Sequence, residues 1–198
     1  MTTDSSLTCQ LFGTYQPTRI TSTAPSRSNS PHIYRRCENY KPQSSISEGE
    51  ETLSAHISLF HALPGSSLNS IRSDIAAAVA CIKPFQIRAM GPPIRMGRGG
   101  VSVSVTGLRP VEELVKDLQA KWRDVLSPQD RRPFCGHYTL MNKEKDPGKV
   151  AQCLQDICHE LPSEGYLGTA IGLSLWRYDN GWWLHKEDFA FSKVENDK

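Results

Sequence analysis

Two short patterns in the sequence pair a histidine with a hydroxyl residue two positions later. His56 is followed by Ser58 and His137 by Thr139, and none of the other four of the six histidines shows this pattern. Side chains alternate along a strand with a period of two, so each pair is expected to point to one face of a strand. If the chain folds into two lobes, the two pairs can face each other.

Two imidazoles and two hydroxyls suit phosphate-ester chemistry without a metal ion. One neutral imidazole can take a proton from the attacking water or hydroxyl, while the other, as imidazolium, protonates the leaving oxygen. An unperturbed histidine pKa near ~6.5 allows both forms at neutral pH. The hydroxyls can donate hydrogen bonds to the non-bridging phosphate oxygens, whose charge grows in the transition state.

The hydrophobic pattern after residue 53 predicts alternating strands and helices. Strands are predicted over 55–60, 85–90, 101–106 and 137–141, helices over 69–82, 111–126 and 148–161, and a hairpin over 168–177 and 182–191. Pro110 lies at the start of the middle helix. The apolar side of that helix comprises Val111, Leu114, Val115, Leu118, Trp122 and Leu126.

This order of elements occurs twice. The same offset of 29 residues separates His56 from Phe85 and His137 from Tyr166, and the two copies start 81 residues apart. Each copy therefore reads strand, helix, strand, strand, and the helix over 111–126 joins them. A duplicated layout in which both copies open on the same two-residue chemistry favours a functional role for His56 and His137 over a structural one.

The first 52 residues differ in composition from the rest. They are rich in Ser and Thr and poor in large apolar side chains, so we expect them to be mostly disordered. Leu7–Tyr15 is the candidate for a short strand within this segment. The predicted organisation is a disordered segment over 1–52, a bilobal domain over 53–192 with repeats that open near 55 and 136, and a charged tail over 193–198.

The sequence resembles the 2H phosphoesterase superfamily, also called the 2′-5′ RNA ligase/cyclic phosphodiesterase family. The resemblance rests on AHISLFHALPG (55–65), on GHYTLMNK (136–143) and on the layout between and after them. It implies an α+β fold of two pseudo-symmetric antiparallel lobes, with helices outside and the active cleft between. It also implies that His56 and His137 are the acid/base pair and that Ser58 and Thr139 bind the phosphate.

Members of that family have a strand and a helix ahead of the first motif. In this chain Leu7–Tyr15 is the candidate for that strand, and the alternative is a first lobe without an edge strand.

Some further residues are candidates for contacts to substrate. Lys143 shares strand parity with His137 and Thr139, so it could reach the same phosphate. Five basic residues in a stretch without Asp or Glu could form a basic lip or a solvated loop: Lys83, Arg88, Arg95, Arg98 and Arg109. Four aromatics are candidates for base stacking, with core packing as the alternative: Trp176, Tyr178, Trp182 and Trp183.

Three other features have structural interpretations. Gly97–Gly100 is predicted to be a hairpin turn rather than a phosphate loop. His61 has the opposite strand parity from His56 and is expected to be structural or solvent-facing. None of the six cysteines forms a CxxC pair, which favours buried free thiols over a zinc site.

Composition excludes several classes of protein. The chain has 198 residues, 38% hydrophobic and 22% charged, with a net charge of +2, so binding to a long nucleic acid through charge alone is not indicated. No apolar stretch is long enough to span a membrane, and residues 1–6 do not resemble the start of a secretory signal. We expect a cytoplasmic monomer, with nuclear localisation as the alternative, and no cofactor or metal.

The predicted function is metal-independent hydrolysis of a 2′,3′-cyclic phosphate, or of ADP-ribose cyclic phosphate, on a nucleotide or RNA end. One alternative is RNA end joining through a 2′-5′ bond, the reverse reaction in the same cleft. Another is a nucleotide- or RNA-binding module without turnover. The paired signatures argue for an enzyme, and the weak amino-terminal element argues for the binding module.

Overall fold

The computed structural model describes residues 6–15, 56–179 and 182–192. Its strands are β1 (Ser6–Tyr15), β2 (Ile57–Pro64), β3 (Phe85–Met96), β4 (Gly100–Thr106), β5 (His137–Met141), β6 (Tyr166–Asp179) and β7 (Trp182–Ala190). Its helices are α2 (Leu68–Val79), α3 (Arg109–Lys121) and α4 (Pro147–Glu160). The predicted order of strand, helix, strand, strand, repeated after a joining helix, is confirmed in the described residues.

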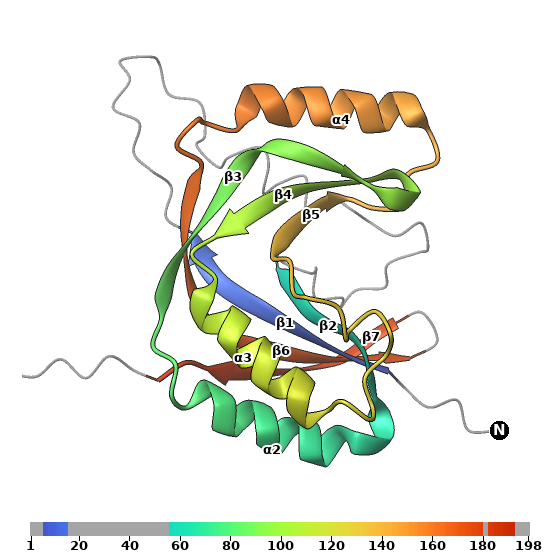
Figure 1. Ribbon diagram of the computed structural model, residues 1–198. Coiled ribbons are helices and arrows are strands. Elements are labelled where there is room, and N and C mark those ends of the chain that lie inside the picture. Colours follow the sequence, from blue (N-terminus) through green and yellow to red (C-terminus); the bar gives the residue numbers. More distant parts are fainter. Residues whose placement is uncertain (1–5, 16–55, 180–181, 193–198) are drawn as a thin grey trace, which may run out of the picture.

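The strands form one antiparallel sheet in the order β2-β1-β6-β3-β4-β5, and β7 pairs with β6 beside β3. The two lobes are β2-β1-β6-β7 and β3-β4-β5, and the long strand β6 joins them (Figure 1). Each lobe contains strands of both sequence copies: β2 shares its lobe with β6 and β7, whereas β5 pairs with β4. The architecture is α+β, as predicted.

Strand β1 lies between β2 and β6 and pairs with both over much of its length. The strand predicted at Leu7–Tyr15 is therefore present, and it is an inner strand rather than an edge. The sequence placed it in a segment ahead of the domain, yet residues 6–15 belong to the same sheet as residues 57–190. The disorder predicted for the rest of 1–52 falls on residues 1–5 and 16–52, outside the described residues, as does the tail over 193–198.

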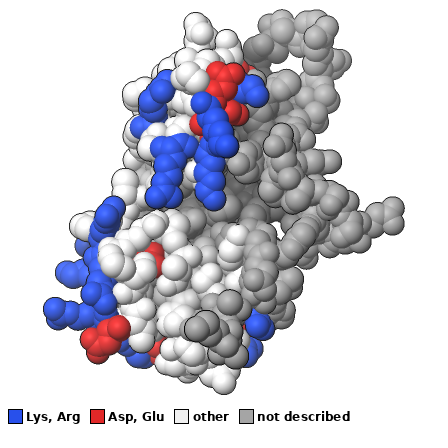
Figure 2. Space-filling view, turned by 90° about the vertical axis from the view of Figure 1, so that its right-hand side faces the viewer, with Lys and Arg blue, Asp and Glu red and all other residues white. Residues whose placement is uncertain are grey.

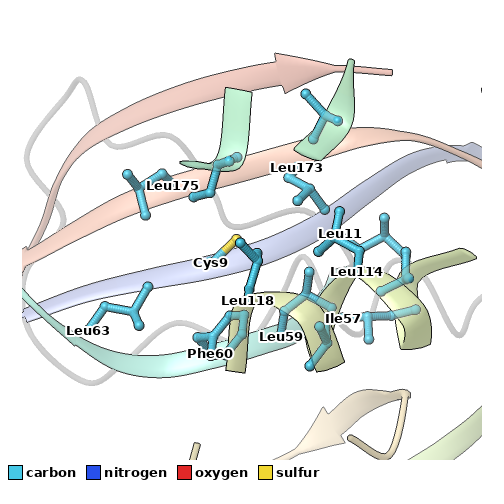
Figure 3. Packing of buried hydrophobic residues seen from close by; sticks show 14 of the residues in the cluster. Cys9, Leu11, Ile57, Leu59, Phe60, Leu63, Leu114, Leu118, Leu173 and Leu175 are labelled. Atoms are coloured by element: carbon cyan, nitrogen blue, oxygen red, sulfur yellow. The ribbon is translucent and has the colours of Figure 1, made fainter. Parts of the chain in front are cut away.

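Helices α2 and α3 cover one face of the first lobe. All six apolar residues predicted for the face of the 111–126 helix are buried, although the helix ends at Lys121 and the last of them lie beyond it. Figure 3 shows the packing of this core. Its labelled side chains come from β1 (Cys9, Leu11), β2 (Ile57, Leu59, Phe60, Leu63), α3 (Leu114, Leu118) and β6 (Leu173, Leu175). Burial of these apolar side chains fixes which face of β1 and β2 turns toward the helices.

Helix α4 covers the second lobe. Asp146 caps its first turn by accepting a hydrogen bond from the Gly148 N–H at 2.8 Å, and Pro147 begins the helix. A smaller core lies between α4 and the strands β3 and β4, formed by Ala89, Val101, Val103, Val150, Cys153 and Ile157. We call the face of the sheet turned away from α2, α3 and α4 the inner face. Alternation along each strand assigns residues to it.

Candidate active site

The first signature lies at the start of β2. Ile57 and Leu59 are buried in the core beneath α2 and α3, so Ser58 between them lies on the inner face. His56 precedes the first residue of the strand, and both His56 and Ser58 are half-buried. The pairing of β2 with β1 shifts register between Ser58 and Phe60, which is a β-bulge. Residues 56–58 come before this bulge, so the bulge does not change the face on which Ser58 lies.

The second signature occupies the short strand β5, whose predicted bounds match the observed ones. Tyr138 packs against both hydrophobic cores, so its neighbours His137 and Thr139 lie on the inner face. His137 is half-buried and Thr139 is exposed. Thus Ser58, His137 and Thr139 all lie on the inner face, as strand alternation predicts.

One ring nitrogen of His137 is fixed by the backbone. The His137 Nδ1 lies 2.8 Å from the carbonyl oxygen of Cys135. Because a carbonyl oxygen can only accept, Nδ1 carries the proton and donates it. This hydrogen bond orients the ring and so sets the direction in which Nε2 points.

The two signature strands lie at opposite ends of the strand order, yet they come together. Cα atoms of β2 and β5 approach within 8 Å of one another, although the two strands do not pair. The sheet is therefore strongly curled, as Figure 1 shows. Curling brings the edge that carries Ser58 next to the edge that carries His137 and Thr139.

Sequence reasoning missed a set of buried polar residues on the inner face beside the signatures. Gln10 of β1 pairs with Ser58 and with Ser174 of β6, and Ser102 of β4 pairs with Thr139. Gln10, Ser102 and Ser174 are each at most 3% exposed. The signal was available as alternation in the sequence, since Gln10 stands between Cys9 and Leu11, and Ser102 stands in Val-Ser-Val-Ser-Val.

Lys143 lies in the turn after β5 rather than in the strand. Its φ of 58° is left-handed, and β5 ends at Met141, so the strand parity that linked it to His137 does not extend to it. Its turn instead contacts the β3–β4 turn, where the Glu144 N–H donates to the Gly99 carbonyl. Arg98 in that turn also has a left-handed φ, of 57°. Lys143 stays a predicted phosphate contact, now from a turn.

These two turns and the end of β3 carry a group of exposed basic residues, which we call the basic rim: Arg95, Arg98, Lys143 and Lys145. Figure 2 looks at the side of the molecule that carries these turns and shows Lys and Arg side chains gathered on the upper lobe. The other residues of the predicted basic lip lie elsewhere. Arg88 donates to the Glu164 carbonyl, and Arg109 pairs with Glu113 one turn along α3. The structure thus brings together only part of the predicted lip.

Gly97–Gly99 forms the predicted hairpin turn between β3 and β4.

A buried carboxylate joins β2 to the segment between α3 and β5. Asp130 accepts hydrogen bonds from the backbone N–H groups of His61 and Ala62, at 2.8 and 3.0 Å, and from the Ser127 hydroxyl. Burial alone would raise the pKa of Asp130, but these bonds and the His61 side chain hold it below its ordinary value. His61 itself is 46% exposed and makes this structural contact with Asp130. The carboxylate therefore ties the first signature strand to the chain that leads to the second.

The predicted aromatic candidates differ in their surroundings. Trp176 is 7% exposed on β6, and Tyr178, two residues later, is 37% exposed. The side chains of Trp182 and Trp183 lie outside what the structure describes.

The cysteines only partly match their prediction. Cys9 and Cys153 are buried, and burial raises the pKa of Cys9 to about 12, but Cys81, Cys135 and Cys158 are exposed. Cys37 is not among the described residues. Within those residues no three His, Cys, Asp or Glu side chains group as metal ligands. No helix in the described part of the chain combines the length and apolar character that crossing a membrane requires.

The chain is similar to solved structures of other proteins, and the first of them shares its fold. TT0787 of Thermus thermophilus is 15% identical, with a TM-score of 0.52 over 94% of this chain and 98% of that chain. Usb1 of Kluyveromyces marxianus matches with a TM-score of 0.45, 11% identity and coverage of 93% and 98%. The same Usb1 with uridine monophosphate gives a TM-score of 0.43 and 10% identity over 93% of this chain and 98% of that chain.

A comparison with curated proteins found no match. The model of the 2′-5′ RNA ligase superfamily matches residues 29–182, which is most of the chain and includes both signatures. The resemblance inferred from the two motifs is thereby confirmed. With paired His-x-hydroxyl strands, the fold and this match in agreement, the chain belongs to the 2′-5′ RNA ligase superfamily, the 2H phosphoesterases.

Proposed function

We propose that this protein is a metal-independent phosphodiesterase that hydrolyses a 2′,3′-cyclic phosphate on a nucleotide or RNA end. ADP-ribose cyclic phosphate is a second substrate of the same chemistry. His56 and His137 act as the acid/base pair, and Ser58 and Thr139 bind the phosphate. Membership of a superfamily of phosphoesterases and ligases supports an enzyme, and the two signatures supply the chemical groups.

The reaction needs one proton removed and one delivered. A neutral imidazole takes a proton from water as its oxygen attacks phosphorus, and the bond from phosphorus to one ribose oxygen breaks. The imidazolium on the other histidine gives its proton to that departing oxygen. The product is a phosphate monoester beside a free hydroxyl, and the histidines exchange protonation states until solvent restores them.

One observation carries this proposal: the approach of β2 and β5 within 8 Å at the meeting edges of a curled sheet. Either signature alone would be compatible with a structural histidine. Two histidines from strands that meet supply the two separate proton-transfer groups that the reaction needs. The hydrogen bond from His137 Nδ1 to the Cys135 carbonyl adds support, because it leaves Nε2 as the reactive nitrogen.

The test is incubation of the purified full chain, in EDTA, with 2′,3′-cyclic nucleotides, ADP-ribose cyclic phosphate and 2′-5′-linked dinucleotides. We expect monoester product from a cyclic phosphate, with no loss of rate in EDTA. The His56→Ala/His137→Ala double variant, purified in the same way, controls for contaminating nucleases. Activity that EDTA abolishes and zinc or manganese restores would contradict the mechanism.

The same assay separates the competing functions. A 2′-5′-joined product from an RNA with a cyclic phosphate end and a second RNA with a 5′-hydroxyl would show a ligase instead. Binding of a cyclic nucleotide without any product would show a binding module. For the hydrolase we expect a bell-shaped dependence of kcat/KM on pH, since one histidine must be neutral and the other protonated. A flat profile between about pH 5 and 9 would exclude both histidines as acid and base.

A further inference from the structure

The amide side chain of Gln10 is buried in the middle of the sheet without a partner among the described residues. Gln10 is 3% exposed, and its side chain makes no hydrogen bond with any other residue in that part of the chain. Its neighbours on the strand, Cys9 and Leu11, occupy the core beneath α3, so the amide lies on the inner face. Buried polar groups in folded proteins are nearly always satisfied, so an amide at this position calls for a partner from outside the sheet.

The strand register places Gln10 beside a signature hydroxyl. Gln10 and Ser58 are Cα partners in the β1–β2 ladder, and their side chains share the inner face. On the other side of β1, Gln10 faces Ser174, whose hydroxyl is already used as a donor to Asp188. The amide of Gln10 is therefore available to a group that Ser58 also binds.

The second lobe repeats the arrangement. Ser102 and Thr139 are partners in the β4–β5 ladder, and Ser102 is 3% exposed. Its hydroxyl likewise makes no hydrogen bond with another described residue. Its strand neighbours Val101 and Val103 belong to the core beneath α4, so its hydroxyl is on the inner face. Each signature hydroxyl thus has, one strand further in, a buried polar neighbour that pairs with no described side chain.

We propose that Gln10 and Ser102 are substrate-binding residues that add two donors to the phosphate site of Ser58 and Thr139. This inference rests on the proposed function and deepens it. The Gln10 amide and the Ser102 hydroxyl donate to the non-bridging oxygens of one phosphate group. All four donors are neutral, which suits a phosphate diester whose two non-bridging oxygens share a single negative charge.

The test replaces each donor by an apolar side chain of similar size, in Gln10→Met and Ser102→Ala. With a 2′,3′-cyclic nucleotide as substrate, we expect kcat/KM to fall about 10²-fold for Gln10→Met, the lower end for loss of one donor to a developing oxyanion. We expect the dissociation constant of the cyclic nucleotide to rise as well. The thermal midpoint should stay the same or rise, because the substitution removes an unpaired buried polar group.

Thr8→Val is the matched control. Thr8 lies on the same strand and face, two residues from Gln10, and its hydroxyl donates to the His61 carbonyl at 3.1 Å. Removing that bond should lower the thermal midpoint and leave kcat/KM within twofold of wild type. If Gln10 had only a structural role, Gln10→Met would lower the thermal midpoint and leave kcat/KM within twofold of wild type, as expected for Thr8→Val. A kcat/KM within twofold of wild type would overturn the proposal.

Binding and turnover of the cyclic nucleotide by the wild-type protein distinguish a wrong phosphate site from a wrong hydrolase assignment. If wild type binds the cyclic nucleotide without turning it over, the hydrolase proposal fails. Weaker binding by Gln10→Met would then still support the phosphate site. If wild type neither binds nor turns over any cyclic phosphate, both proposals are wrong.

Discussion

The two signatures share one His-x-hydroxyl pattern, but their strands have very different structural surroundings. Strand β2 contributes Ile57, Leu59, Phe60 and Leu63 to the larger core, and its far end is held by Asp130. Strand β5 has only five residues, none of them fully buried, and borders the smaller core beneath α4. The turn after β5 carries Lys143 and Lys145 of the basic rim, and the end of β3 and the β3–β4 turn beside it carry the rest. One signature thus adjoins a strand that packs into the larger core, and the other lies on a short strand next to an exposed cationic surface.

A site built from two halves has three properties to compare: proton transfer, stability and attraction of the substrate. In the proposed mechanism proton transfer uses a histidine from each half, so loss of either should slow the reaction strongly, whatever its structural surroundings. Stability should depend more on the lobe of β2, where the larger side chains are packed. Attraction of a charged substrate should depend more on the lobe of β5. Each of the following variants compares one of these properties between the halves.

The largest effect is expected from the histidines. His56→Ala and His137→Ala should each lower kcat by roughly 10²–10⁴-fold while substrate binding is largely retained, since each removes one proton-transfer partner. The double variant should lose far less than the product of the two effects, because the pair acts as a unit. Steady-state kinetics on the three variants, with binding measured separately, checks this. Turnover in wild type that is unaffected by either substitution would mean that the site is elsewhere.

The next effect compares the stability of the two lobes. Phe60 is 0% exposed and packs edge-on against Trp122, with ring centroids 5.1 Å apart. Phe60→Ala should lower the free energy of unfolding by about 3–5 kcal/mol. Ile157→Ala, in the core beneath α4, should cost about 2–5 kcal/mol and less than Phe60→Ala.

Urea unfolding of both variants measures this difference. Val125→Ala is the control, because its side chain is exposed and the substitution should cost at most about 0.5 kcal/mol. A larger loss from Ile157→Ala than from Phe60→Ala would reverse the assignment of the more stabilising lobe.

The hydroxyls give a smaller kinetic effect. Ser58→Ala and Thr139→Val should each lower kcat by up to about 10²–10³-fold, the range for loss of one oxyanion donor. Ser58 is half-buried and Thr139 is exposed, so the hydrogen bond from Ser58 should be stronger and its loss more costly. Comparison of kcat for the two variants, at saturating substrate, tests this order. Equal losses would show that burial does not distinguish the two donors once substrate is bound.

Local pattern was sufficient to predict the order of the elements after residue 53 and the face on which Ser58 and Thr139 lie. The bounds of β5, the buried side of α3 and the face of Ser58 and Thr139 all follow from periodicity and from Pro and Gly positions. These properties depend on residues close together in the sequence. The fold class and family followed from the repeated order of elements and from the two motifs.

Properties that depend on distant residues could not be predicted in the same way. Strand β1 pairs with β6, which lies more than 150 residues away in the chain, and nothing in Leu7–Tyr15 indicates that partner. The bulge at Leu59 and Phe60 and the exchange of strands between the two sequence copies are likewise set by packing. Lys143 was assigned to strand parity because the left-handed backbone that ends β5 has no clear local signal.

Acid should act first on the lobe that carries β2. Among the described residues, Asp130 and Asp74 are carboxyls with a lowered pKa, and in each case hydrogen bonds outweigh the effect of burial, which would raise the pKa. A pKa below the unfolded value of about 3.9 means that the stabilisation is present above that pH and is lost as pH falls through the folded value. Wild-type stability should therefore decrease below about pH 4.

Substitution of Asp130 should reduce that dependence. Asp130→Asn should lower the free energy of unfolding at pH 7 by about 1–3 kcal/mol, because it weakens charge-assisted bonds to two backbone N–H groups of β2. Its stability should also change less than that of wild type between pH 5 and about 2. Urea unfolding across this range measures both quantities. An unchanged acid dependence in Asp130→Asn would mean that other groups cause it.

The smallest effect is expected from the basic rim. Arg98 and Lys143 are exposed, and neither forms an ion pair with another described residue, so their charges are available to a substrate that extends past β5. Arg98→Gln and Lys143→Gln should each raise KM for an RNA oligonucleotide with a cyclic phosphate end. The increase should be only a few-fold, because exposed charges are screened by water and salt.

Each of the two substitutions should also reduce the slope of log KM against log salt by about 0.7, the value for one phosphate contact on a single strand. KM for a cyclic mononucleotide should not change with Arg98→Gln, since that substrate has no phosphate other than the cyclic one. Lys116→Gln, which removes an exposed charge on α3, is the control. If it weakens oligonucleotide binding as much as the two rim variants do, net charge rather than the position of the rim attracts the substrate.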